Sequence, residues 1–262
     1  MVGRRGETPL VPPDILPSFK KALACGRGRV RLVRELELPK IDAMVTTLPT
    51  NSRESSERSH FSWGRAVWHP LPVGMLVAVL VSLAIDLPVA DYARTGKQPR
   101  WVSELLENAE PFGHGIGTTL IVIAVLVLDP VRRRTPLPLL AGSLGAGLAA
   151  NLAKLLVIRF RPRDIEVLPE TVWLTFGGVW SLSGGNSSQS FPSAHTATAV
   201  GLAVMLSAYY PRGRWFFTVM AILVGMQRIH CSAHFPSDVF AGAIVGWVVA
   251  VASLQLASRN SR

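Results

Sequence analysis

Six apolar runs, separated by short polar connections, follow one another from about residue 70 to near the end of the chain. They cover residues 71–90, 115–128, 137–158, 193–210, 215–226 and 239–257. A helix that crosses a bilayer needs about 20 mostly apolar residues, and the second and fifth runs reach that length only with their flanks. Gly and Ala are frequent in the runs, and small residues let helices approach closely in lipid. The pattern predicts an all-α fold, a six-helix transmembrane bundle over residues 70–257.

The same runs could instead be buried helices of a large soluble core, but helices that are apolar on every side are more typical of a membrane. Residues 1–69 differ, because they are polar, basic and interrupted by Pro and Gly. They contain no uninterrupted apolar core of the kind that a secretory signal needs. We therefore expect a basic, largely disordered cytoplasmic tail at 1–69 and a short cytoplasmic tail at 258–262.

The composition narrows the class of protein. Of the 262 residues, 49% are hydrophobic and only 17% are charged, with a formal net charge of +10. This apolar bulk excludes a disordered polycation, and the low share of charged residues argues against an ordinary soluble enzyme. Two cysteines are too few for a disulfide-rich mini-domain or a Cys-rich zinc module. The net charge alone could reflect nucleic acid, anionic lipid, an anionic substrate or membrane topology.

The placement of the positive charge favours membrane topology as the explanation of the net charge. Arg132–Arg134 follow the second run, Arg212 and Arg214 follow the fourth, and both chain ends are basic. In a six-helix serpentine all of these lie on one side, which is cytoplasmic by the positive-inside rule. We therefore expect no nucleic-acid partner, cytoplasmic N- and C-termini and, in a bacterium, location in the inner membrane. The non-cytoplasmic side then carries the connections 91–110, 159–192 and 229–236.

Three short stretches carry charged or polar side chains at that non-cytoplasmic side, where charge near a membrane helix indicates function. In the first, Arg161, followed by Pro162, lies seven residues after Lys154, which is two turns if the helix continues. In the second, Ser193 is a plausible N-cap of the fourth helix, and a helix N-terminus is an anion site.

The third stretch places His234 four residues before Asp238, so that the carboxylate could orient the imidazole. Arg228 precedes both, and the serpentine brings all three stretches to one small volume. Lysine, two arginines and a helix N-terminus suit a multiply charged anion, most plausibly phosphate. His234 is then a potential nucleophile and His195 a potential general acid, and neither role requires a metal or other cofactor.

These stretches together resemble the tripartite signature of the type 2 phosphatidic acid phosphatase superfamily. The signature elements are Lys154-x6-Arg161-Pro162, Pro192-Ser193-Ala194-His195 and Arg228-x5-His234-x3-Asp238. The superfamily includes lipid phosphate phosphatases and undecaprenyl-pyrophosphate phosphatases. The resemblance therefore implies an integral membrane phosphatase that acts on a lipid phosphate or isoprenoid diphosphate at the outer membrane face.

The resemblance also implies a role for each matched residue. His234 would attack phosphorus and form a phosphohistidine, Asp238 would orient it, and His195 would protonate the leaving oxygen and then activate water. Phosphoryl oxygens would be held by Lys154, Arg161, Ser193, Arg228 and the backbone N–H of Ala194. The family pattern has Gly at Ala194 and usually Ser at Gln227, a longer side chain that could alter the fit of the substrate.

Two other functions stay open. A phosphotransferase would use the same intermediate with an acceptor other than water, and a non-catalytic lipid-phosphate-binding protein would have lost activity through changes such as Ala194 and Gln227. Outside the motif, we interpret Arg163 as an interfacial anchor and give His114 and His230 no role. Cys25 and Cys231 lie on opposite sides in this topology, which argues against a disulfide between them.

Overall fold

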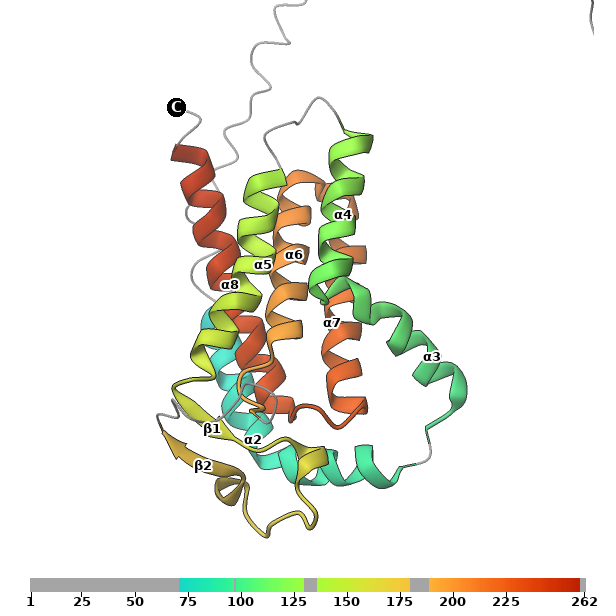
Figure 1. Cartoon of the computed structure of the whole chain (residues 1–262), viewed down its shortest axis with the longest axis vertical. Helices are drawn as coiled ribbons and strands as arrows, with labels where there is room; N and C mark the ends of the chain where they lie inside the picture. The colour runs from blue at the N-terminus through green and yellow to red at the C-terminus, as the bar shows by residue number, and fades with distance from the viewer. Residues whose placement is uncertain (1–70, 97, 130–135, 180–188, 260–262) are drawn as a thin grey trace, which may run out of the picture. The chain divides into compact units, whose positions relative to one another are not determined.

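The computed structural model describes residues 71–96, 98–129, 136–179 and 189–259. The predicted tail at 1–69 lies outside these residues, and of the predicted tail at 258–262 only Ser258 and Arg259 are described, as the end of α8. The described chain is mostly helical (Figure 1). Its α-helices are α2 (Leu71–Thr95), α3 (Arg100–Ala109), α4 (Gly115–Leu128), α5 (Pro136–Ala153), α6 (Ala194–Tyr209), α7 (Arg214–His230) and α8 (Pro236–Arg259). Two strands form an antiparallel pair, β1 (Val157–Arg159) and β2 (Phe176–Val179).

Each of the six apolar runs forms a helix, namely α2, α4, α5, α6, α7 and α8. By length and composition, α2 and α8 are long and apolar enough to cross a membrane. α3 and the short 3-10 helix after it meet α4 at a bend of 65°, and this bent pair gives a third span if it is counted as one. α5 and α6 are apolar but shorter. The described helices thus include two clear membrane-span candidates. The prediction was six spanning helices, and this criterion identifies two or, with the bent pair, three among the described residues.

Small residues bring the central helices together. α5, α6 and α8 pack against one another, α2 lies against α8, and α7 lies against α6. A Cβ atom on Gly242 of α8 would lie 2.4 Å from the carbonyl oxygen of Ser193, and one on Gly246 would lie 2.4 Å from that of Ala197. Glycine at these two positions therefore permits the close approach of α8 to the start of α6.

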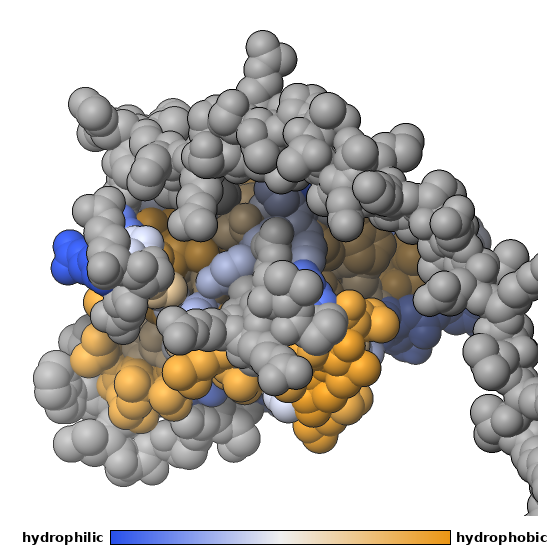
Figure 2. Space-filling model, turned by 90° about the horizontal axis from the view of Figure 1, so that it is seen from above, coloured by the Kyte–Doolittle hydropathy of each residue, from blue (hydrophilic) through white to orange (hydrophobic). Residues whose placement is uncertain are grey.

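The outside of the helices is apolar, as expected for a surface in lipid. Val81 on α2 and Leu120 on α4 are about 60% exposed, and many other large apolar side chains are exposed along the same helices. Where the described surface is visible in Figure 2, apolar residues form much of it. In water such a surface would favour association, so its extent supports a membrane environment.

Two features differ from the sequence prediction. The third run was expected to be helical through residue 158, but α5 ends at Ala153 and β1 begins at Val157. The β-branched side chains of Val157 and Ile158 favour a strand, and Pro162 keeps Arg161 extended, at φ −77° and ψ 146°. The fold is therefore not strictly all-α. The amphipathic helix α3 lies in what was expected to be the connection 91–110.

Candidate active site

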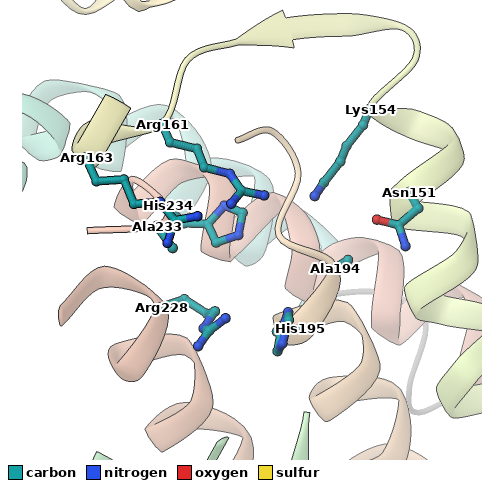
Figure 3. Close-up of a pocket in the computed structure, with 9 residues that line it drawn as sticks. All are labelled: Asn151, Lys154, Arg161, Arg163, Ala194, His195, Arg228, Ala233 and His234. Carbon is teal, nitrogen blue, oxygen red and sulfur yellow. The ribbon is translucent and has the colours of Figure 1, made fainter. Parts of the chain in front are cut away.

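One cavity of about 350 Å³ lies at the end of the bundle where α5 and α7 end and α6 begins (Figure 3). All three predicted stretches contribute to its wall. Its lining residues are Asn151, Lys154, Arg161, Arg163, Ala194, His195, Arg228, Ala233 and His234. Two further predicted residues, Ser193 and Asp238, are fully buried and do not belong to this lining.

Helix ends and the connections between elements, rather than helix interiors, hold most of these side chains. Lys154 follows the last residue of α5, and Arg161 lies in the extended segment after β1. Arg228 is in the last turn of α7, while His234 lies in the tight connection from α7 to α8. Ser232 in that connection has a φ of 52°, a value that is uncommon for residues other than glycine.

Four cationic side chains line the cavity, those of Lys154, Arg161, Arg163 and Arg228 (Figure 3). Lys154 is only 4% exposed, and burial, followed by repulsion from Arg161, lowers its pKa to about 8. Burial also lowers the pKa of Arg161. The cavity therefore concentrates positive charge in a place with little water, which favours binding of an anion.

The start of α6 adds a helix N-terminus to this site. Ser193 caps the helix, as predicted, because its Oγ accepts a hydrogen bond from the backbone N–H of Thr196 at 3.4 Å. Its hydroxyl also accepts from Thr196 Oγ1 at 2.9 Å, so it serves the helix start. The first N–H groups of a helix point out of its N-terminus, and Ala194 and His195 form that turn.

His234 is held from one side. It is 4% exposed, and its Nδ1 lies 3.8 Å from Oδ2 of Asp238 and 3.4 Å from Oγ of Ser190. Burial lowers the pKa of the His234 imidazole, so the neutral form is favoured. With Nδ1 directed at Asp238 and Ser190, Nε2 is the ring nitrogen left for the cavity.

Glu110, which the sequence analysis did not single out, is the acidic neighbour of the cationic site. Its Oε1 accepts a hydrogen bond from Nη2 of Arg228 at 2.7 Å and lies 3.8 Å from Nε2 of His195. The ring of His114 lies 5.7 Å from the ring of His195. Glu110 belongs to the short helix after α3, and only the fold brings this segment to α6 and α7.

Gln227 and Arg163 occupy places that the sequence analysis did not predict. Gln227 is 4% exposed, and its Oε1 accepts from Nε of Arg228 at 2.5 Å, so it holds that arginine and is not itself in the cavity lining. Arg163 was interpreted as an interfacial anchor, but its side chain lines the cavity. Asn151 also lines it, one helical turn before Lys154.

The arrangement suits a tetrahedral anion held by cations and a helix N-terminus, with a neutral imidazole facing it. Within the described ranges, no group of three or more His, Cys, Asp and Glu side chains is arranged to hold a metal ion.

Comparison with known proteins gives a consistent picture. The model of the PAP2 superfamily matches residues 135–262. A lipid A 1-phosphatase of Rhizobium etli is 32% identical over 187 residues, which are 64% of this chain and 75% of that protein. An undecaprenyl-diphosphatase of Sulfolobus acidocaldarius is 33% identical over 70 residues, or 26% of this chain and 34% of that protein.

The fold has a relative among solved structures. The chain resembles the crystal structure of a transmembrane PAP2-type phosphatidylglycerolphosphate phosphatase from Bacillus subtilis, with a TM-score of 0.50 and 20% identity, over 72% of this chain and 96% of that one. This likeness concerns the fold alone. Together with the family match and the R. etli relative, it shows that this integral membrane protein belongs to the PAP2 superfamily of membrane phosphatases.

Proposed function

We propose that the protein hydrolyses a lipid phosphate or an isoprenoid diphosphate through a phosphohistidine on His234, without a metal ion. The observation that carries this proposal is the arrangement of His234, whose Nδ1 faces a buried carboxylate at 3.8 Å while Nε2 is left for a cavity lined by four cations. A neutral imidazole oriented in this way is a nucleophile, and the cations can stabilise the charge of the phosphoryl group in transfer.

In the first step, Nε2 of His234 attacks phosphorus, the Nε2–P bond forms, and the bond from phosphorus to the leaving oxygen breaks. The bound phosphate anion favours the imidazolium form of His195, which gives its proton to the leaving oxygen. Lys154, Arg161 and Arg228 bind the phosphoryl oxygens, as do the N–H groups at the start of α6. Asp238 compensates the positive charge that the substituted imidazole acquires.

In the second step, water attacks phosphorus and the P–Nε2 bond breaks. His195, now without its proton, takes the proton of the attacking water and returns to its starting state. Inorganic phosphate leaves and His234 is neutral again. A phosphotransferase would differ only in the acceptor of this step, and product analysis with alcohol acceptors separates the two.

The non-cytoplasmic face is the proposed location of the cavity. The end of α4, the start of α5, the turn between α6 and α7 and the end of α8 lie at the opposite end of the helices (Figure 1). Arg212, Arg214 and Arg259 belong to these segments, and Arg132–Arg134 stand between α4 and α5 in the sequence. The positive-inside rule would place them in the cytoplasm.

The relatives support a lipid phosphate as the substrate class, since they are named as phosphatases of lipid A and of undecaprenyl diphosphate. A panel of lipid A, phosphatidic acid, phosphatidylglycerophosphate and undecaprenyl diphosphate should reveal phosphate release from at least one member by the detergent-solubilised protein. His234→Ala and His195→Ala should each abolish most of this release, whereas wild-type turnover in both variants would refute the mechanism.

A matched control is His230→Ala, because His230 contacts Ser103 at 3.1 Å and does not belong to the cavity lining. It should retain wild-type turnover. Brief incubation with labelled substrate, followed by denaturation, should leave an acid-labile, base-stable phosphoryl group on the wild-type protein. The same label on His234→Ala would place the intermediate elsewhere.

A further inference from the structure

A second charged cluster lies behind the cavity and is entirely buried. Its members are Arg159 at the end of β1, Asp86 in α2 and Asp238 in the first turn of α8, and none of them has any exposed surface. Burial of three charges is costly unless each is paired and hydrogen-bonded. The sequence alone predicted no role for Arg159 or Asp86.

Arg159 is fixed at all three nitrogens of its guanidinium. Its Nη1 lies 2.5 Å from Oδ1 of Asp238, its Nη2 lies 2.6 Å from Oδ2 of Asp86, and its Nε donates to Oγ1 of Thr175 at 3.1 Å. The rings of Phe176 and Phe235 lie 4.5 and 4.2 Å from its central carbon. An arginine so enclosed is unable to reach the cavity, and its contacts can only hold other side chains.

Asp86 ties this arginine to the start of α8. The backbone N–H of Ser237 donates to Oδ1 of Asp86 at 2.9 Å, and Oγ of Ser237 donates to Oδ2 at 2.5 Å. The same Oγ accepts from Nη1 of Arg159 at 2.7 Å. A carboxylate of α2 thus caps the first turn of α8, next to Asp238.

The two oxygens of Asp238 have separate partners. Oδ1 accepts from Arg159, whereas Oδ2 accepts from Oγ of Ser190 at 2.5 Å and from the backbone N–H of Phe235 at 2.8 Å, and it faces Nδ1 of His234. Because Arg159 holds the far oxygen, rotation of the carboxylate would break an ion pair. Oδ2 is therefore kept on the side of His234.

The charges of the cluster are also unbalanced. One guanidinium faces two carboxylates, which leaves one net negative charge in a buried place. An imidazolium at His234 would neutralise this charge, and such an imidazolium forms when Nε2 becomes phosphorylated. The cluster is therefore electrostatically matched to the intermediate rather than to the resting state.

We propose that Arg159 and Asp86 are positioning residues of the phosphoryl-transfer reaction, which orient Asp238 and stabilise the charge that His234 acquires. This inference rests on the proposed function. It links α2, which contributes no residue to the cavity wall, to the nucleophile through a chain of buried ion pairs.

The test is Asp86→Asn, which keeps the shape of the side chain and leaves Arg159 paired with Asp238, so that the fold can persist. We expect kcat to fall by about 10- to 100-fold, the usual effect of removing a group that orients another. KM and inhibition by inorganic orthovanadate, a phosphate analogue, should stay close to wild type, because the cavity wall is unchanged. The rate of phosphohistidine formation in a single turnover should fall in parallel with kcat.

Ser82→Ala is the matched control, since Ser82 lies one turn earlier in α2, is equally buried and bonds only the carbonyl of Val79, at 2.8 Å. It should retain wild-type kcat. If Asp86→Asn does not fold, the test uses Ser237→Ala, which removes the hydroxyl that bridges Asp86 and Arg159. The same fall in kcat is expected for this variant, but a smaller one. Wild-type kcat in the folded variant, or a rise in KM alone, would overturn the inference. A wild-type protein without phosphatase activity would overturn the proposed function instead.

Discussion

Arg159 and Arg161 are two residues apart in the chain but lie in opposite surroundings. Arg159 has no exposed surface and directs its donors to two carboxylates and two hydroxyl groups. Arg161 makes one long hydrogen bond, from Nε to the carbonyl of Gln189 at 3.4 Å, and its guanidinium extends into the cavity (Figure 3). An arginine whose three nitrogens all have partners in the protein holds the fold together, whereas one with free donors can bind a ligand. Substitution of each arginine separates these two tasks.

Removal of Arg159 should have the largest effect, and the effect should be on stability. In Arg159→Met, Asp86 and Asp238 would remain buried without their shared cation, which costs about 3–5 kcal/mol. Thermal unfolding in detergent should show a large fall in Tm and poor recovery of the folded protein. An Arg159→Met protein with wild-type Tm would mean that the buried cluster contributes little to the fold.

Arg161→Met should leave Tm nearly unchanged and reduce kcat/KM by about 10²- to 10³-fold, the effect of losing one group that stabilises transferred charge. Orthovanadate should also inhibit this variant more weakly. Arg100→Met is the control, because Arg100 is exposed and pairs only with Glu104 on the surface of α3. A lower Tm with unchanged kcat/KM in Arg161→Met would mean that Arg161 stabilises the fold, as Arg159 does, and does not bind the substrate.

The sequence predicted the helices and the cavity wall better than the buried cluster, for a physical reason. Apolar runs identify helices through composition alone, and motif spacing brought Lys154, Arg161, His195, Arg228 and His234 to one place. The amphipathic α3 and the pair β1–β2 are short and lack a strong apolar signal, so tertiary packing decides them.

Arg159, Asp86 and Glu110 depend on contacts between elements far apart in the chain. Asp86 and Arg159 are separated by 73 positions, and Glu110 and Arg228 by 118. No local pattern encodes such pairs. One signal was available: a carboxylate inside an apolar run is expensive in a membrane and is expected to have a partner. That signal should have directed attention to Asp86, although it would not have named Arg159.

Within the cavity, Lys154 provides a pH test of the cationic wall. Its pKa of about 8 means that its positive charge is present below that pH and is lost above it. If the other steps are insensitive to pH, kcat/KM should fall by about tenfold per pH unit well above this value. In Lys154→Arg, whose charge persists, the alkaline limb should move to higher pH. An unchanged limb would assign this titration to another group.

The smallest expected effect concerns Glu110, which brings a negative charge into the otherwise cationic region. Its carboxylate shares Arg228 with any bound anion, at 2.7 Å from Nη2. Glu110→Gln should therefore lower the orthovanadate concentration needed for half inhibition by a few-fold, and added salt should reduce the difference, because this partly exposed pair is screened by ions. Glu107→Gln, an exposed substitution one turn earlier on α3, is the control. Weaker inhibition of Glu110→Gln would mean that Glu110 chiefly orients Arg228 for the anion, and would place this pair with the structural cluster around Arg159.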